Sequence, residues 1–236
     1  MTLNFIEWGS GDRTALLLHG MGASAESWWR AGPAIADRGY RVIALDLPGH
    51  GRSPRDPSAS NDSVATAVID FWKSVSVHPP AVAIGHSFGG AILAVARARF
   101  RAERTVFVDS PFVARGGWDY EETRREYSAH RTMTTLESLR RDRPFWSEHD
   151  REIEVRASEL FDPATAASIA AGPPGSWLPE GGDALVIRAN PSEYVSDERA
   201  AELGSRGVIV RDIAGAAHSV WYTHFDEFMT ALDGWV

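Results

Sequence analysis

The residues best suited to chemistry form a five-residue segment, Gly85–Gly89, that reads GHSFG. An apolar run precedes it and an alanine-rich stretch follows it, which predicts a sharp turn from a strand into a helix. In such a turn the central residue, Ser87, takes a strained backbone conformation that holds its hydroxyl in the open. This context predicts that Ser87 is a nucleophile. The alternative is that the glycines serve only tight packing.

A serine hydroxyl needs a neutral imidazole to accept its proton at neutral pH. Of the eight histidines, only His218 lies in the loop between the last predicted strand and the final helix, in the segment Gly215–His218. We therefore expect His218 to be the general base. His50, within PGHG, is interpreted as a turn residue, and His86 as a residue that fills space beside Ser87.

Attack on a carbonyl creates a negative oxygen that backbone N–H groups can stabilise. The segment His19–Gly22 reads HGMG and ends the first core strand, and its glycines allow the backbone to approach a substrate. We predict an oxyanion hole formed by the N–H groups of Met21 and Phe88. Removing one such donor typically costs about 3–4 kcal/mol of transition-state stabilisation.

The elements that must position these residues alternate along the chain. The predicted strands are continuously apolar, as strands covered on both faces should be, and span 14–18, 41–45, 81–84, 105–108, 184–187 and 208–210, with an edge strand over 4–8. The predicted helices span 25–38, 62–76, 89–101, 197–205 and 220–235. This rhythm predicts an α/β fold with a doubly wound, mostly parallel sheet.

The alternation is interrupted between residues 111 and 182. This stretch is polar, rich in arginine and glutamate, and punctuated by the Gly172–Gly175 cluster. We expect residues 1–110 and 183–236 to form the core and residues 111–182 to form a small helical cap. Such an insertion would lie over the carboxyl ends of the strands, where ligands bind in these folds.

Composition and charge argue against several classes of partner, cofactor and chemistry. The formal charge of −8 argues against nucleic acid or an anionic membrane as a partner, and the lack of cysteine excludes disulfides and thiolate catalysis. The histidines do not fall at metal-ligand spacing and no dinucleotide-binding loop is present, so we expect neither a metal nor another cofactor. No apolar run is long enough to span a bilayer, and Met1–Trp8 carries Glu7 and no basic, apolar leader. We expect a cytoplasmic protein of unknown oligomeric state.

These motifs, together with DLPGHGRS at 46–53, resemble those of the α/β-hydrolase superfamily, and the resemblance runs from Leu16 to the C-terminus apart from the insertion. It implies a nucleophile, acid and histidine triad. The family most often takes its acid from the loop after the strand 184–187, where this chain has Ser192. Compact esterase-like members instead take it after the family's sixth strand, which corresponds to Asp109. We choose Asp109, with Glu193 as the second candidate; the alternative is that Asp109 only caps a turn.

The resemblance implies a serine hydrolase that cleaves a carboxylic ester or lactone through an acyl-enzyme on Ser87. Two alternatives stay open: a C–C bond hydrolase or haloperoxidase-like enzyme on the same triad, and a ligand receptor with slow turnover. A serine nucleophile disfavours haloalkane dehalogenases and epoxide hydrolases, which use aspartate. We expect a small-molecule substrate with an apolar or aromatic acyl part, bound by Trp28, Trp118, Trp146 and Trp221. Several of these aromatics could instead hold the insertion on the core.

Overall fold

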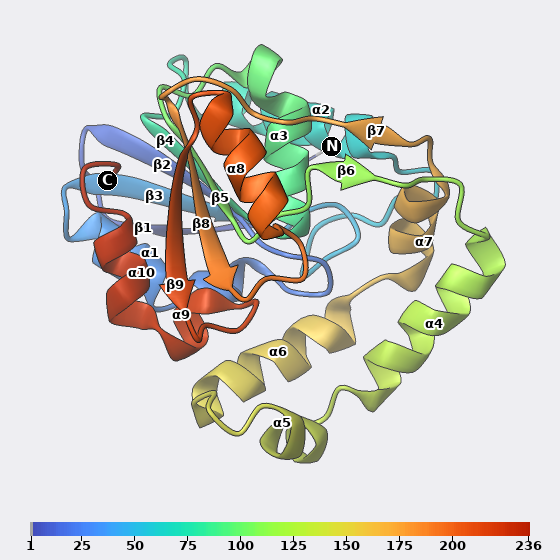
Figure 1. Cartoon of the computed structure of the whole chain (residues 1–236). Helices are drawn as coiled ribbons and strands as arrows, with labels where there is room; N and C mark the ends of the chain where they lie inside the picture. Colours follow the sequence, from blue (N-terminus) through green and yellow to red (C-terminus); the bar gives the residue numbers. More distant parts are fainter. Residues whose placement is uncertain (1) are drawn as a thin grey trace.

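The computed structural model describes residues 2–236 and contains a central seven-stranded sheet (Figure 1). The strand order is β1-β3-β2-β4-β5-β8-β9, and every neighbouring pair is parallel except β1 with β3. The strands are β1 (Phe5–Trp8), β2 (Arg13–Leu18), β3 (Tyr40–Leu45), β4 (Val82–His86), β5 (Thr105–Val108), β8 (Ala184–Asn190) and β9 (Ile209–Ala214). This is the doubly wound, mostly parallel α/β fold predicted from the sequence.

Helices cover both faces of the sheet, which explains why its central strands are apolar throughout. Successive side chains of a strand point to opposite faces, so Leu16 and Leu18 of β2 enter one buried cluster while Ala15 and Leu17 enter the other. The first cluster is covered by α2 (Asn61–Val75), α3 (Phe88–Phe100) and α8 (Asp197–Ser205). The second is covered by the 3-10 helix η1 (Ala25–Trp28), α1 (Ala31–Ala36), α9 (Val220–Thr223) and α10 (Phe225–Ala231).

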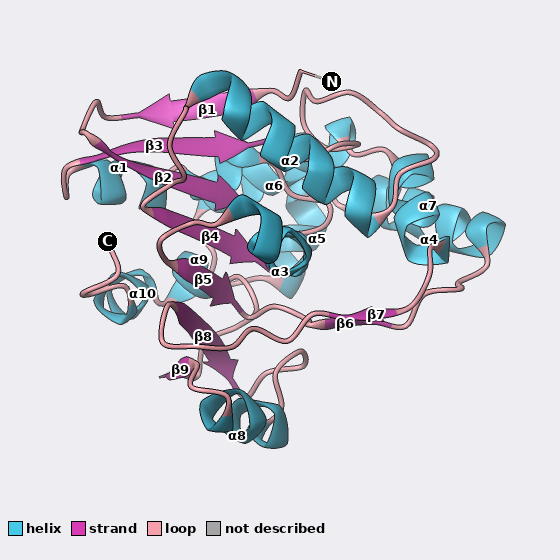
Figure 2. Ribbon diagram, turned by 90° about the horizontal axis from the view of Figure 1, so that it is seen from above, coloured by secondary structure: helices cyan, strands magenta, loops and turns pink. Residues whose placement is uncertain are grey.

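The segment between β5 and β8 leaves the sheet at the carboxyl ends of the parallel strands (Figure 2). It contains β6 (Val113–Ala114), α4 (Tyr120–Met133), α5 (Leu136–Asp142), α6 (Glu148–Leu160), α7 (Pro163–Ala171) and β7 (Gly175–Ser176). Strands β6 and β7 pair with each other as an antiparallel two-stranded ribbon. We call residues 111–182 the cap and propose that they form a separate unit.

The segment 46–53 makes hydrogen bonds both within the core and to the cap. The buried carboxylate of Asp46 accepts hydrogen bonds from the backbone N–H groups of Ala25 and Arg52, at 2.7 and 2.8 Å, and so fixes the loop. The carbonyl of Gly49 in this loop then accepts the N–H of Asp162, which caps α7, at 2.8 Å. The segment therefore has a structural role, because it holds the start of α7 of the cap against the core.

Two helices predicted as single elements are divided, so those predictions were wrong. Within 25–38, η1 is followed by a separate helix α1, which has Pro33 in its first turn, where a missing N–H is tolerated. Within 220–235, His224 takes non-helical backbone angles and separates α9 from α10. Strand β9 is also longer than predicted because it lies at the sheet edge and carries polar residues such as Arg211 and Asp212.

Across residues 2–236, no helix combines the length and the apolar character that crossing a membrane requires.

Candidate active site

Strands β4 and β5 end at the same level of the sheet, beside Ile187 of β8, and present their next residues side by side. Ser87 follows β4, and its N–H donates to the carbonyl of Val108 at 3.0 Å. Asp109 follows β5, and its N–H donates to the carbonyl of Ile187 on β8 at 2.8 Å. The register of the sheet thus places Ser87 and Asp109 on neighbouring strand ends, although 22 positions separate them in the sequence.

Ser87 occupies the turn between β4 and α3 with φ 49° and ψ −118°, a conformation that L-residues rarely adopt. The turn is tight enough to require glycine. A Cβ on Gly89 would lie 2.4 Å from the carbonyl oxygen of Leu18, and one on Gly85 would lie 2.6 Å from the backbone of Gly90. The GHSFG spacing therefore has a direct steric cause.

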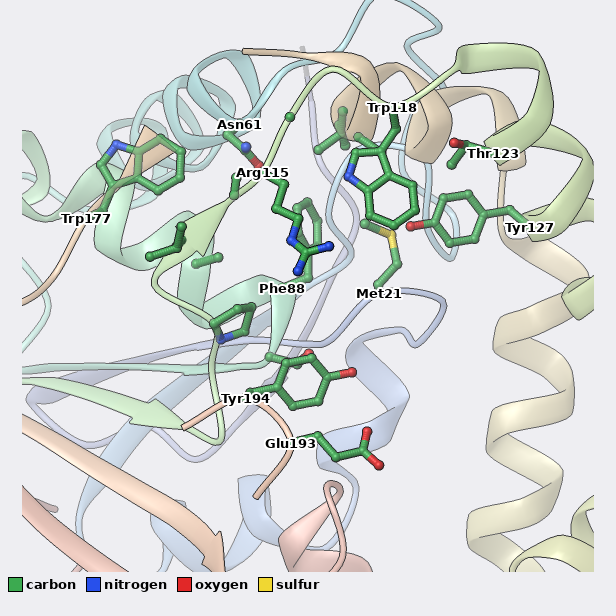
Figure 3. A pocket seen from close by; sticks show the side chains of 18 of the residues that line it. Met21, Asn61, Phe88, Arg115, Trp118, Thr123, Tyr127, Trp177, Glu193 and Tyr194 are labelled. Atoms are coloured by element: carbon green, nitrogen blue, oxygen red, sulfur yellow. The ribbon is translucent and has the colours of Figure 1, made fainter. Parts of the chain in front are cut away.

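The imidazole of His218 lies beside the Asp109 carboxylate. Its Nδ1 is 2.7 Å from Oδ2 of Asp109, whose side chain is only 2% exposed. A hydrogen bond from Nδ1 leaves Nε2 as the proton-accepting nitrogen of the neutral ring. By contrast, no hydrogen bond joins Glu193, the second candidate acid, to His218 among residues 2–236, and its carboxylate points away from the cavity centre (Figure 3).

The second oxygen of Asp109 is held by one residue at the end of β8 and one in the loop that follows it. Its Oδ1 accepts a hydrogen bond from the hydroxyl of Ser192 at 2.6 Å and one from the N–H of Ala189 at 3.3 Å. Ser192 is the residue that the resemblance described above aligns with the usual position of the acid. Here it donates a hydrogen bond to the acid that lies on the neighbouring strand.

The two predicted oxyanion donors lie on either side of Ser87. Phe88 is the first residue of α3, and the first N–H groups of a helix have no acceptor within it. Met21 follows the end of β2, in the loop where Gly20 comes close to the turn. A Cβ on Gly20 would lie 2.8 Å from Nδ1 of His86 and 3.4 Å from Cβ of Ser87.

His86 contacts the backbone of the general-base candidate. Its Nε2 lies 3.1 Å from the carbonyl oxygen of His218, and the two ring centroids are 4.5 Å apart. Burial, and then the proximity of His218, hold the pKa of His86 well below its usual value. A neutral His86 adds no positive charge that would compete with protonation of His218.

Three cavities surround these residues. The largest, about 750 Å³, includes Ser87, Phe88 and Met21 in its lining and extends under the cap, where Trp118, Tyr127 and Arg115 point into it (Figure 3). A second, about 90 Å³, is lined by both Ser87 and His218. A third, about 400 Å³, is lined by His218 and Asp109 but not by Ser87.

The four predicted substrate-binding tryptophans have different surroundings. Trp118 lines the largest cavity and is 51% exposed, Trp146 lines the third, and Trp221 lines the smallest. Trp28 is fully buried behind Trp221, with the two rings stacked 4.3 Å apart, and lines none of the three cavities. The structure thus brings three of the four to a cavity wall and places Trp28 in the core.

Sequence reasoning missed two groups at the site. Tyr194 lies against His218, with ring centroids 4.3 Å apart, and lines the large cavity. Glu154, on α6 of the cap, lines the smallest cavity and accepts a hydrogen bond from the hydroxyl of Tyr222 at 2.8 Å. Burial, assisted by the nearby Asp150 and opposed by the Tyr222 hydrogen bond, raises the pKa of Glu154 to about 7. No local motif marks either residue, because tertiary packing brings them to the site.

Within residues 2–236, no group of three or more histidine or acidic side chains is arranged to hold a metal ion.

A model of the alpha/beta hydrolase family matches residues 15–231. Among curated proteins, the magnesium-chelatase 30 kDa subunit of Rhodobacter capsulatus is 45% identical over 91 residues, which are 37% of this chain and 31% of that protein. A pimeloyl-[acyl-carrier protein] methyl ester esterase of Methylococcus capsulatus is 37% identical over 119 residues, 48% of this chain and 44% of that protein. The matches thus span less than half the length of each of these relatives.

A solved structure of an N-acyl homoserine lactone degrading enzyme superposes with a TM-score of 0.77 at 20% identity, covering 99% of this chain and 96% of that one. This likeness concerns the fold. Because the family model extends over nearly the whole sequence and the strand–serine–helix turn lies where that fold has it, the chain belongs to the alpha/beta hydrolase family.

Proposed function

We propose that this protein is a serine hydrolase that cleaves a carboxylic ester or a lactone through an acyl-enzyme on Ser87. The observation that carries the proposal is the 2.7 Å contact between Nδ1 of His218 and the buried Asp109 carboxylate, next to a serine held in a strained turn. A similar arrangement of serine, imidazole and carboxylate performs acyl transfer on several unrelated folds. The relatives described as an esterase and as a lactone degrading enzyme agree with this choice.

In the proposed mechanism, Oγ of Ser87 attacks the carbonyl carbon of the substrate while Nε2 of His218 takes the hydroxyl proton. Asp109 stabilises the imidazolium and keeps its Nδ1–H in place. The N–H groups of Met21 and Phe88 stabilise the oxyanion. His218 then gives its proton to the leaving oxygen, the C–O bond breaks, and the acyl group remains on Ser87.

Water completes the cycle by the same steps. Nε2 of His218 takes a proton from a water molecule whose oxygen attacks the acyl carbon, and the proton passes to Oγ of Ser87 as the acid departs. No metal or cofactor takes part in this scheme. The large cavity, with the apolar side chains of Met21, Phe88 and Trp118 in its lining, suits an apolar or aromatic acyl group.

The proposal is tested by trapping the intermediate. The protein is mixed with methyl butyrate, quenched in acid, digested and examined by mass spectrometry. We expect a butyryl group on the peptide that contains Ser87, and none in Ser87→Ala. Turnover that survives unchanged in Ser87→Ala would contradict the acyl-enzyme. Absence of turnover with esters and lactones would favour the receptor alternative.

A further inference from the structure

Ser87 stands at the boundary between two cavities of very different size. The larger measures about 750 Å³ and the smaller about 90 Å³, and Met21, one of the proposed oxyanion donors, lines both. His218 lines only the smaller of the two. The two halves of an ester bound at Ser87 would therefore meet different amounts of space.

The chemistry of the acyl transfer decides which half enters which cavity. In the tetrahedral intermediate the carbon carries the Ser87 oxygen, the oxyanion, the acyl chain and the leaving oxygen. Only the leaving oxygen has to receive a proton from Nε2 of His218, so it must lie on the His218 side of Ser87. That side is the small cavity, and the acyl chain is left with the large one.

The third cavity does not offer an alternative path for the leaving group. It is lined by Asp109 and Ser192 together with His218, so it lies along the Nδ1 edge of the imidazole, which the Asp109 carboxylate already occupies. Ser87 does not line it. A leaving oxygen placed there could not receive the proton that Nε2 has taken from Ser87.

The walls of the small cavity are well packed. Trp221 is 2% exposed, stacks on Trp28, and donates its indole N–H to the carbonyl of Ser27 at 2.9 Å. On the cap side, Glu154 is held by the hydroxyl of Tyr222. A volume of about 90 Å³ corresponds to about three water molecules at ~30 Å³ each, and so to an alkoxy group of about two or three non-hydrogen atoms.

We propose that the substrate is an ester of a short, uncharged alcohol with a bulky acyl group, in which the alcohol leaves through the small cavity between His218 and Glu154. This inference rests on the proposed function and adds the substrate class. The Glu154 carboxyl opposes entry of an anionic leaving group, because ionisation of both groups in this enclosed space is unfavourable.

The test uses two series of esters with the unmodified protein. Methyl, ethyl, butyl and cyclohexyl esters of one aromatic acid vary the alcohol, and methyl esters from acetate to octanoate vary the acyl chain. Acid release is followed by titration at constant pH. We expect kcat/KM to fall about tenfold or more between the ethyl and butyl esters, since a misfit of one methylene changes discrimination by roughly 10–200-fold. Along the acyl series we expect kcat/KM to hold or rise.

Two substitutions change the small cavity in opposite directions. Glu154→Ala enlarges it and should raise the ratio of butyl to methyl ester rates several-fold, whereas the size-matched control Glu154→Gln should not. Ala23→Val, at another lining position, fills the cavity and should lower the ratio of ethyl to methyl ester rates. The pair keeps the test informative even if one variant folds poorly.

The outcomes separate the two proposals. Equal kcat/KM for methyl and cyclohexyl esters, abolished by Ser87→Ala, would overturn the assignment of the leaving group and leave the serine hydrolase intact. A preference for acetate over octanoate together with tolerance of large alcohols would reverse the assignment of the cavities. Hydrolysis that does not depend on Ser87 would contradict the proposed function itself.

Discussion

The Asp109 carboxylate is fixed by three neighbours: His218, Ala189 near the end of β8, and Ser192 in the loop after β8. The hydrogen bond from Ser192, at 2.6 Å, is the shortest of them and reaches the oxygen that His218 does not use. This bond holds the plane of the carboxylate and therefore the direction of the acceptor that faces Nδ1 of His218. Ser192 therefore acts as a positioning residue for the Asp109 carboxylate.

We expect Ser192→Ala to lower kcat for ester hydrolysis by about tenfold with little change in KM. The variant loses one hydrogen bond to a charged group, worth about 1.5–3 kcal/mol, part of which a water molecule would restore. Steady-state kinetics provide the measurement. Ser205→Ala, at an exposed position on α8, is the matched control and should leave both constants unchanged. An unchanged kcat in Ser192→Ala would show that Asp109 needs no support from this hydroxyl.

The carboxyl group of Glu154 makes the stability of the folded protein depend on pH. Its pKa is raised from 4.5 to about 7, mainly by burial, so the folded state holds a proton that the unfolded state releases between these pH values. The wild-type protein therefore loses stability as the pH rises from about 4.5 to 7, and the loss is complete above 7. Glu154→Gln removes the ionisation.

We expect the free energy of unfolding of Glu154→Gln, relative to wild type, to increase by about 1–3 kcal/mol between pH 4.5 and pH 8. Urea unfolding at several pH values provides the measurement. Glu159→Gln, on the exposed face of the same helix, should show no such trend. A stability difference between Glu154→Gln and wild type that is independent of pH would refute the shifted pKa.

At the scale of elements, the turn between β4 and α3 depends on the absence of side chains. Gly89→Ala would place a Cβ 2.4 Å from the carbonyl oxygen of Leu18, and backbone atoms on both sides leave little room to move. We expect a loss of at least about 2 kcal/mol in unfolding free energy and a large loss of activity.

Gly204→Ala, within α8 and with no atom within 4 Å of the added Cβ, is the matched control and should instead stabilise the protein by about 0.5 kcal/mol. Thermal unfolding and ester hydrolysis would show both effects, and a stable, active Gly89→Ala would contradict the steric argument.

The strands of the sheet interior could be predicted from the sequence because both of their faces are buried. Runs such as 14–18 and 105–108 are apolar without interruption, and the structure has strands there. The edge strand β9 was only partly predicted, since a strand with one solvated side carries polar residues. The helix predicted over 25–38 crosses Gly32 and Pro33, although proline favours the start of a helix, whereas no glycine or proline marks the division at His224.

The residues of the site also differ in whether the sequence alone could predict them. Ser87 and Met21 lie in loops and Phe88 begins α3, and local signals of glycine and strand–helix order surround all three, so sequence alone could single them out. Asp109 could be proposed only by comparing two strand ends. Tyr194 and Glu154 reach the site through the packing of the cap and of the loop after β8, and no spacing in the sequence encodes that approach.

At the scale of the whole molecule, three buried histidines beneath the site make the fold sensitive to acid. Burial lowers the pKa of His19 and of His86, and it lowers that of His50 to about 3. Below pH 6.5 the unfolded chain binds protons that the folded chain does not. The free energy of unfolding should therefore decrease as the pH falls, by roughly 1.4 kcal/mol per pH unit for each histidine that stays neutral.

This dependence is measured by urea unfolding between pH 7 and pH 5 in the Glu154→Gln background, which removes the opposing contribution of Glu154. We expect a steep decrease in unfolding free energy, and a smaller decrease when His50→Leu is added, because His50 then no longer takes up a proton on unfolding. A stability that stays constant over this range would contradict the neutral state of the three histidines.

The measurement that tests the central claim most directly compares the hydrolysis of methyl acetate and methyl butyrate by wild type, Ser87→Ala, Asp109→Asn and Glu193→Gln. We expect Ser87→Ala to abolish turnover, Asp109→Asn to lower kcat by up to about 10⁴-fold, and Glu193→Gln to change kcat little. A collapse of kcat in Glu193→Gln with Asp109→Asn active would contradict the assignment of the acid, and full activity of Ser87→Ala would contradict the serine nucleophile itself.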